Sequence, residues 1–289
     1  MIFDGICLRK IVAELHTCLI DGKVNKVFAP TKNEILLSIY SHGTQYALLA
    51  SIASDNYHLN LTTTSKPNPL KASNFCMLLR KHLIGFRITK IKMRGLERIV
   101  FIHLAGYNEM NDPSQKILVI ELMGKHSNIL LLTEKGTIID SLRHLDIDSG
   151  ATRDLLPAHP YEMPENTKVD FEQFATEQDF LVYCKPLSAQ NLTQLLANHL
   201  IGISKNYVET FLETQNRTNE VSEENLSAFY QSFRNDLAEI HKTQESTTPI
   251  HTWNFACDDF YSQKEEKRTL QHISSKPCPS CFRRFEKSA

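Results

Sequence analysis

The sequence lacks any apolar run long enough to cross a membrane. The two longest, Tyr46–Ala53 and Ile117–Met123, are well short of the roughly 18 residues that a spanning helix requires. Asp4 lies within the first few residues, and polar and basic residues follow it, so the start resembles neither a signal peptide nor a myristoylation site. We therefore expect a cytoplasmic protein with no membrane partner.

The sequence motifs of the common enzyme classes are also absent. There is no G-x-x-x-x-G-K followed by Ser or Thr, and no G-x-G-x-x-G, H-E-x-x-H or G-x-S-x-G. These patterns hold phosphates, a zinc ion or a nucleophilic serine. Their absence favours a binding protein with no catalytic residue and no cofactor.

Neither cysteine nor aspartate offers a convincing metal site. Five of the seven cysteines are scattered, mostly within apolar runs where a thiol behaves as a small hydrophobe. Cys278 and Cys281 have the spacing of half a zinc ribbon, with His272 nearby, but a structural zinc site needs four ligands. Three aspartates within 140–148 surround His144, a pattern that fits a solvated loop better than a metal site. We expect no bound metal.

Charge is unevenly divided although the formal net charge is only -1. Residues 1–160 carry 19 Lys and Arg against 14 Asp and Glu, whereas residues 161–289 carry 13 against 19. The densest basic stretch is 80–98, whose only acid is Glu97. Such a stretch is either a solvated face or a surface for phosphate groups. Its cations are Arg80, Lys81, Arg87, Lys90, Lys92, Arg94 and Arg98.

The first half of the sequence has an α+β pattern. Apolar residues at helical spacing predict a helix over 6–20, and Ser73 is suited to cap a second helix that ends at Leu83. Short segments of β-type composition between turn signals predict antiparallel strands. Their expected ranges are 23–28, 34–40, 44–52, 57–63, 88–93, 98–104, 116–123, 128–133 and 137–143.

Three prolines within Leu156–Pro164 mark a domain boundary, after which the pattern becomes helical. Helices are predicted over 171–183, 189–199, 204–214 and 222–241. We expect an α+β domain over 1–160, a mostly α-helical domain over 161–258, and the start of a charged helix or coiled coil over 259–289. The turn Leu200–Ser204 has the apolar-Gly-apolar pattern of a helix-hairpin-helix, which can be structural or can bind phosphate. The acidity around it favours a structural role.

The most informative string is Glu121–Asn128, Glu-Leu-Met-Gly-Lys-His-Ser-Asn. An apolar strand runs into a glycine that allows close backbone approach, followed by four side chains that can donate hydrogen bonds. This pattern is typical either of an RNA-binding edge or of a polar turn. The candidate phosphate or nucleic-acid contacts from the two basic regions are Arg80, Lys81, His82, Arg94, Lys125, His126, Ser127 and Asn128.

At these residues the sequence resembles the N-terminal part of the NFACT family of ribosome quality-control factors, whose bacterial members are also called fibronectin-binding protein A-like. The resemblance runs in order through Phe3-Asp4-Gly5, Phe75–Leu83, Gly95–Arg98, Glu121–Asn128 and Leu155-Leu156-Pro157. It implies an NFACT-N domain of antiparallel β-sheets with flanking helices, akin to the N-terminal domain of Fpg/MutM-type DNA glycosylases. A helix-hairpin-helix domain and then a coiled coil are implied to follow.

The resemblance also implies a function. Family members bind the obstructed 50S ribosomal subunit that carries peptidyl-tRNA, and they recruit alanyl-tRNA for untemplated alanine tailing while the ribosome performs peptidyl transfer. Asp4, Glu97 and Arg98 match family positions associated with tRNA recruitment, with Glu97 standing where the family has Asp. A carboxylate beside a guanidinium can pair with the edges of an exposed base, and the guanidinium can also reach phosphate.

Two alternatives stay open from the sequence. One is a surface adhesin for fibronectin or fibrinogen, which conflicts with the absence of an export signal. The other is a DNA-glycosylase-like nucleic-acid-binding protein, but Ile2 stands where those enzymes have proline and no four-cysteine zinc finger is present. The resemblance implies that the family continues with a long coiled coil and an NFACT-R domain, which we do not expect within these 289 residues.

Overall fold

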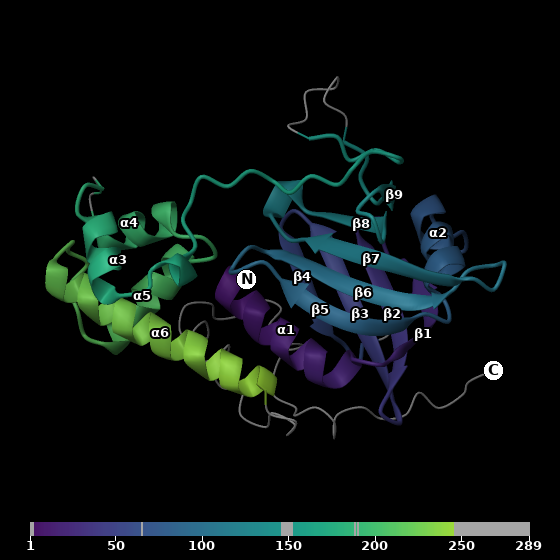
Figure 1. Ribbon diagram of the computed structural model, residues 1–289, viewed down its shortest axis with the longest axis horizontal. Coiled ribbons are helices and arrows are strands. Elements are labelled where there is room, and N and C mark those ends of the chain that lie inside the picture. Colours follow the sequence, from purple (N-terminus) through teal and green to yellow (C-terminus); the bar gives the residue numbers. More distant parts are fainter. Residues whose placement is uncertain (1–2, 65, 146–152, 188, 190, 246–289) are drawn as a thin grey trace.

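The computed structural model describes residues 3–64, 66–145, 153–187, 189 and 191–245. A β-sheet with two helices forms one unit, and a group of short helices with one long helix forms the other (Figure 1). The helix α1 (Gly5–Leu19) lies between the two units. No helix within the described ranges has the length and apolar character needed to cross a membrane.

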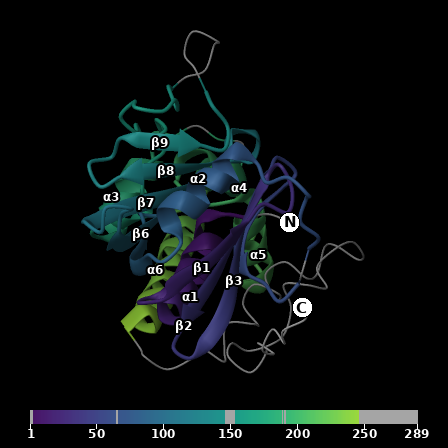
Figure 2. The ribbon, with the colours of Figure 1, turned by 90° about the vertical axis from the view of Figure 1, so that its right-hand side faces the viewer.

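Nine strands form one antiparallel sheet in the order β4-β3-β2-β1-β5-β6-β7-β8-β9. The strong change of strand direction across the sheet in Figure 2 is the twist that neighbouring strands impose on one another. The strands are β1 (Lys23–Phe28), β2 (Glu34–Ser41), β3 (Thr44–Ala53), β4 (Asn56–Leu61), β5 (Arg87–Met93), β6 (Ile99–Tyr107), β7 (Pro113–Glu121), β8 (Asn128–Thr133) and β9 (Ile138–Ser141).

Arg143 joins the two ends of this sheet. It follows β9, and its guanidinium donates hydrogen bonds to the Ile52 carbonyl on β3 at 2.8 Å and to the Asn33 side chain before β2 at 3.1 Å. Its other terminal nitrogen reaches the carbonyls of Lys125 and Ser127 at 3.3 and 3.2 Å. The sheet therefore curls until its two ends are held together at this corner.

The main core lies on the inner face of the sheet, under α1 and α2 (Asn74–Leu83). Leu8, Val12 and Leu15 of α1 and Leu79 of α2 are almost fully buried there against alternate residues of the strands. The alternation is the reason that the strand pattern could be recognised in the sequence. The linker between β9 and η3 is described over 153–170, and on the outer face its residues 155–163 cover a smaller cluster around Ile99 of β6.

The helical unit contains a short 3-10 helix, η3 (Phe171–Gln173), and four α-helices. Its core is rich in aromatic rings, among which Phe171 contacts Phe180 and Phe233 edge-on at 5.6 and 4.6 Å between centroids. The α-helices are α3 (Glu177–Cys184), α4 (Leu192–His199), α5 (Lys205–Thr214) and α6 (Glu223–Glu245).

The two units meet at a close contact between three backbone segments. Gly5 donates its N–H to the Gly202 carbonyl at 2.9 Å. A Cβ on Gly5 would lie 2.2 Å from the Leu96 carbonyl oxygen, and one on Gly202 would lie 2.4 Å from the same oxygen. Leu96, together with Ile6 and Ala13 of α1, belongs to the helical unit's core. The turn between α4 and α5 is thus packed against the sheet unit.

The structure confirms the α+β class and the antiparallel sheet. The nine predicted strands all form, and they make one sheet rather than several. The helix predicted over 171–183 is wrong in one respect: it divides into η3 and α3, because Thr176 caps α3 in a reciprocal capping box with Asp179. The helix-hairpin-helix assignment and the glycosylase likeness stay predictions. Residues 259–289, Cys278, Cys281 and His272 lie outside the described residues.

We expect Gly202→Ala to destabilise the protein more than Gly136→Ala does. Both glycines have positive φ, 72° and 82°, so an alanine costs about 1–2 kcal/mol of backbone strain at either position. A Cβ at Gly136 meets nothing within 4 Å, whereas one at Gly202 meets the Leu96 backbone, which adds about 1–3 kcal/mol. Urea unfolding of both variants measures the difference. Equal losses would mean that the joint can relax around the added methyl group.

Candidate functional site

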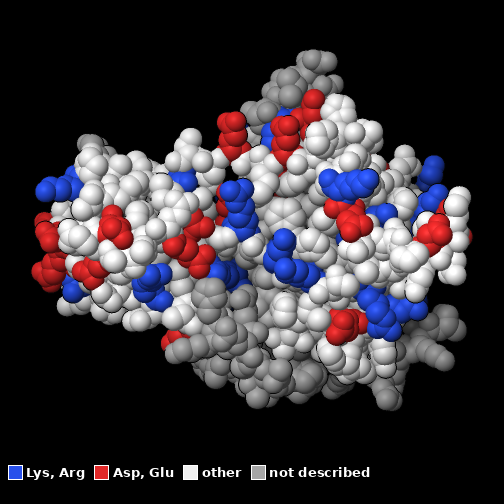
Figure 3. All heavy atoms as spheres, viewed as in Figure 1, with Lys and Arg blue, Asp and Glu red and all other residues white. Residues whose placement is uncertain are grey.

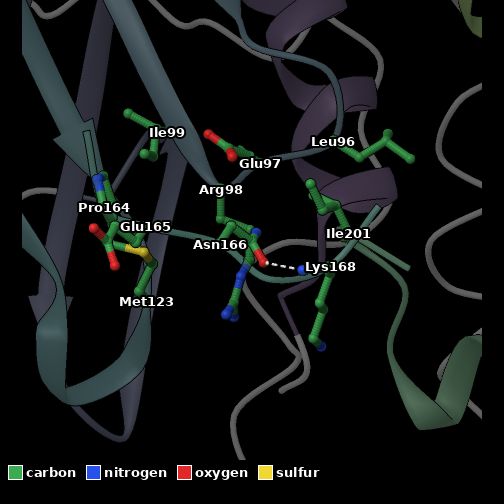
Figure 4. Close-up of a pocket in the computed structure, with 11 residues that line it drawn as sticks. Leu96, Glu97, Arg98, Ile99, Met123, Pro164, Glu165, Asn166, Lys168 and Ile201 are labelled. Atoms are coloured by element: carbon green, nitrogen blue, oxygen red, sulfur yellow. Dashed lines mark hydrogen bonds between the residues drawn. The ribbon is translucent and has the colours of Figure 1, made fainter. Parts of the chain in front are cut away.

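A pocket of about 250 Å³ opens where the sheet, the linker and the turn between α4 and α5 meet (Figure 4). The start of β6 contributes one wall, and the linker before η3 contributes another. Because its walls come from both units, the pocket depends on the contact between Gly5, Leu96 and Gly202 that joins them. Its lining includes Glu97, Arg98, Met123, Glu165, Lys168 and Gly202.

Arg98 is half-buried directly before β6, an interior strand of the sheet, and one of its terminal nitrogens is hydrogen-bonded. This nitrogen donates to the Tyr57 hydroxyl at 3.0 Å and, at 3.5 Å, to the Phe3 carbonyl. The guanidinium carbon lies 5.7 Å from the centre of the Tyr57 ring. Such an anchored guanidinium is pre-organised to bind a carboxylate or a phosphate.

Glu97 does not accompany Arg98, although the two are adjacent in the sequence. Figure 4 shows the two side chains leaving the backbone in opposite directions. Burial raises the pKa of Glu97, the charge of Arg94 opposes this shift, and the charge of Asp170 adds to it. One carboxylate oxygen of Glu97 is buried and has no hydrogen-bond partner among the described residues. This arrangement does not favour a contact of both side chains with a single base, and the implied role of Glu97 in tRNA recruitment stays a prediction.

Asp4 is a buried capping residue, only 4% exposed. One of its carboxylate oxygens accepts the N–H of Cys7 at 2.9 Å and caps α1, and the other accepts the hydroxyl of Ser204 at 2.8 Å. Ser204 in turn caps α5 by accepting the N–H of Tyr207. Both carboxylate oxygens are therefore engaged within the protein. The implied role of Asp4 in tRNA recruitment stays a prediction, and this geometry favours an indirect one.

Ser127 and Asn128 are interior residues, each 1% exposed. The Ser127 hydroxyl accepts the N–H of Met123 at 2.8 Å, and the Asn128 side chain accepts the N–H of Arg143 at 2.9 Å and donates to its carbonyl at 2.7 Å. Their burial does not favour a direct contact with nucleic acid, which stays a prediction for these two residues. Lys125 and His126 lie in the short 3-10 helix η1 (Gly124–His126) and are exposed, so they remain candidates for contact with nucleic acid.

The start of the same string holds a buried ion pair that the sequence patterns did not reveal. Glu121 is fully buried, and Arg153 binds both of its oxygens at 3.0 and 2.9 Å. The Tyr161 hydroxyl donates to Glu121 at 2.8 Å, and burial followed by the charge of Glu121 strongly raises the pKa of Tyr161. Both partners come from the linker, and no spacing rule connects them to Glu121.

The basic stretch 80–98 is divided by the fold. The helix α2, which carries Arg80, Lys81 and His82, lies at the end of the sheet away from the helical unit (Figure 1). Arg80 donates to the Val27 carbonyl at 2.9 Å, and Lys81 pairs with Glu109 at 3.4 Å. Burial and the charges of Lys116 and Lys81 lower the pKa of His82. The structure therefore does not bring this group to the pocket.

Other cations of the stretch lie closer to the joint. Figure 3 shows Lys and Arg side chains gathered on one face around the junction of the two units, with acidic side chains beside them. Arg94 is exposed and contacts the sulfur of Met163 in the linker at 3.3 Å.

Within the described residues no three His, Cys, Asp or Glu side chains are placed to hold a metal ion. The His144 side chain is hydrogen-bonded to the Asp140 carboxylate at 2.6 Å.

Lys168 also lines the pocket, and it belongs to none of the sequence motifs. It lies 70 positions after Arg98, in a linker whose prolines obscure any periodic pattern. Its ammonium donates to the Ala197 carbonyl of α4 at 2.7 Å. Burial first, and then the charge of Arg98, lower the pKa of Lys168.

Comparison with known proteins identifies the family. A sequence model of the NFACT N-terminal and middle domains matches residues 4–281. The chain belongs to the NFACT family. The NFACT match spans both units, the joint and the pocket, so the sequence-based resemblance is confirmed.

Individual NFACT relatives support the same assignment. Over 225 residues the chain is 32% identical to "Rqc2 homolog RqcH" of Bacillus subtilis, covering 77% of this chain and 39% of that protein. Over 141 residues it is 28% identical to the human "Ribosome quality control complex subunit NEMF", covering 49% of this chain and 12% of that protein. The chain thus spans well under half the length of these two relatives.

A solved structure has the same fold. The N-terminal part of the fibronectin/fibrinogen-binding protein from Streptococcus suis superposes with a TM-score of 0.68 at 28% identity. The match covers 80% of this chain and 85% of that one. The arrangement of sheet and helices is therefore shared with that protein.

We expect Arg153→Met to lower the free energy of unfolding by about 3–5 kcal/mol, because Glu121 would be left buried and uncompensated. Adding Glu121→Gln to that variant removes the charge while keeping an acceptor for Tyr161, so most of the loss should be recovered. Urea unfolding of the single and double variants measures this. A double variant as unstable as the single one would show that packing of the arginine stem, and not the charge, was lost.

We expect Glu97→Gln to raise the unfolding midpoint at pH 7. A carboxyl whose pKa is raised in the folded state binds its proton more tightly there than in the unfolded chain, so stability falls as pH rises through its raised pKa. The amide avoids that loss. The gain should therefore shrink as pH is lowered toward the ordinary carboxyl range. Unfolding curves between pH 4 and pH 8 measure it, and a gain that is independent of pH would contradict the expectation.

Proposed function

We propose that this chain is a binding module of ribosome-associated quality control, which binds tRNA and the large ribosomal subunit. The observation that carries the proposal is the NFACT family match over residues 4–281. The name of the human relative, a ribosome quality control complex subunit, supports the choice of pathway. Such a role would place the protein in the cytoplasm.

In this proposal the module recruits alanyl-tRNA to an obstructed 50S subunit that still carries peptidyl-tRNA. Untemplated alanine residues are then added to the stalled chain by the peptidyl transferase of the ribosome. The module contributes binding and positioning and no catalytic residue. Arg98 supports the nucleic-acid part of the proposal, because its anchored guanidinium lines an open pocket.

A second candidate rests on the solved relative, which is named as a fibronectin/fibrinogen-binding protein. Binding to immobilised fibronectin and fibrinogen at physiological salt would support this candidate. An Arg98 variant that keeps fibronectin binding and loses tRNA binding would separate the two functions.

We expect Arg98→Ala to weaken tRNA binding about tenfold at low salt, because a charge-assisted hydrogen bond to phosphate is lost. Binding of alanine tRNA and of other tRNAs should be measured by fluorescence anisotropy across a salt series. Lys135→Ala is the matched control, since Lys135 is an exposed cation in the β8–β9 turn at the other end of the strands. Absence of tRNA binding by the unaltered chain, even at low salt, would refute the proposed function.

A further inference from the structure

Two cations from distant parts of the chain line one side of the pocket. Arg98 precedes β6, and Lys168 lies in the linker before η3. Figure 4 shows their side chains extending in the same direction, and the charge of Arg98 acts on Lys168. Such a pair is a feature of the folded chain, since nothing in the local sequence joins them.

The guanidinium of Arg98 has unused donors. Its two hydrogen-bond partners, the Tyr57 hydroxyl and the Phe3 carbonyl, both bind the same terminal nitrogen. Among the described residues, the second terminal nitrogen and the Nε atom bond to none, although a guanidinium carries five N–H donors. Arg98 is therefore oriented by one nitrogen while the others stay available to a ligand.

Lys168 is held in a similar way. An Asx turn, in which the Asn166 side chain accepts the N–H of Lys168 at 3.0 Å, fixes the local backbone. One N–H of the ammonium is used by the Ala197 carbonyl near the C-terminal end of α4. An ammonium has three N–H donors, so two of them remain for a ligand.

The pocket offers these cations no anionic partner among the described residues. Glu97 lines it, but its side chain extends away from Arg98, and Glu165 forms no ion pair with either cation in the described structure. Two like charges near each other in a half-buried place are mutually unfavourable. Burial, and after it the charge of Arg98, lower the pKa of Lys168. A bound anion between them would remove the repulsion and use the free donors of both side chains.

We propose that the pocket binds one phosphate group of an RNA chain, with Arg98 and Lys168 as its two ligands. The choice of RNA rests on the proposed function. The size agrees with it: about 250 Å³ is below the roughly 300–1,000 Å³ of pockets that enclose a small-molecule cofactor, and it suits one unit of a polymer. Because Arg98 comes from the sheet and Lys168 from the linker bound to α4, the phosphate also ties the two units together.

The test is a double-mutant cycle with a fluorescein-labelled single-stranded RNA oligonucleotide and the whole chain. Lys168→Gln should weaken binding about tenfold at low salt, and the slope of log K against log salt should fall by about 0.7, the value for one phosphate on a single strand. Lys168→Arg should retain most of the binding. The losses from Arg98→Ala and Lys168→Gln should not add, because both side chains bind the same phosphate.

Several results would overturn the inference. They are a Lys168→Gln variant that binds like the unaltered chain, losses that add fully, or a loss matched by Lys135→Gln. Thermal unfolding of each variant without RNA checks that the linker is intact. When the oligonucleotide is added, the unfolding midpoint of the unaltered chain should rise, and the midpoints of the variants should not. Unlabelled RNA, a nucleoside monophosphate and inorganic phosphate should also be compared as competitors at equal phosphate concentration. If either small molecule displaces the oligonucleotide as well as RNA does, the pocket binds a free phosphate and the assignment to RNA is wrong.

The inference and the proposed function can fail separately. If tRNA binds and Arg98→Ala weakens it while Lys168→Gln does not, the proposed function stands and the two-cation phosphate site is refuted. If no tRNA binds but the oligonucleotide is held by both cations, the phosphate site stands and the tRNA assignment fails.

Discussion

The carboxylate of Asp4 is the contact on which the arrangement of the two units depends. One oxygen caps α1 and the other binds the hydroxyl of Ser204, which itself caps α5. Each helix begins with unpaired N–H groups and a partial positive charge, so one buried anion stabilises two helix starts that lie 200 residues apart. The backbones of Gly5, Leu96 and Gly202 close around this point, where any side chain on either glycine would separate them. The joint is thus fixed by geometry that tolerates little change, and the pocket beside it inherits that rigidity.

The local structures could be predicted from the sequence because each depends on short-range patterning. Alternation gives β2 and β6, Ser73 marks the start of α2, and Thr176 would have divided the predicted helix at 171–183 had its capping box been used. The shared role of α1 could not be found in this way. Its apolar stripe predicts one buried face, yet Leu8 and Val12 face the sheet while Ile6 and Ala13 face the helical unit. Which partner covers a residue is a long-range property that periodicity does not contain.

Of the two cations that line the pocket, only Arg98 could be predicted from the sequence. Arg98 was identified through a family string that also contains Glu97, but the side chains of the two residues leave the turn before β6 in opposite directions (Figure 4). The residue that does accompany Arg98 is Lys168, and it is brought there by the path of the linker. A sequence pattern can identify a candidate ligand, but the second ligand depends on the fold.

The path of the linker is itself set by a charge in the sheet. Glu121 is fully buried, and a buried carboxylate is tolerated only when it is paired and hydrogen-bonded. Arg153 and Tyr161 satisfy it, and both belong to the segment that leaves the sheet, so this segment must cross the outer face at Glu121. From Tyr161 only six residues remain before Lys168, which limits where that side chain can lie. Three polar groups of the string Glu121–Asn128 therefore hold backbone and linker in position, namely Glu121, Ser127 and Asn128. The linker that Glu121 holds carries Lys168, so a buried charge in the sheet limits where a cation of the pocket can lie.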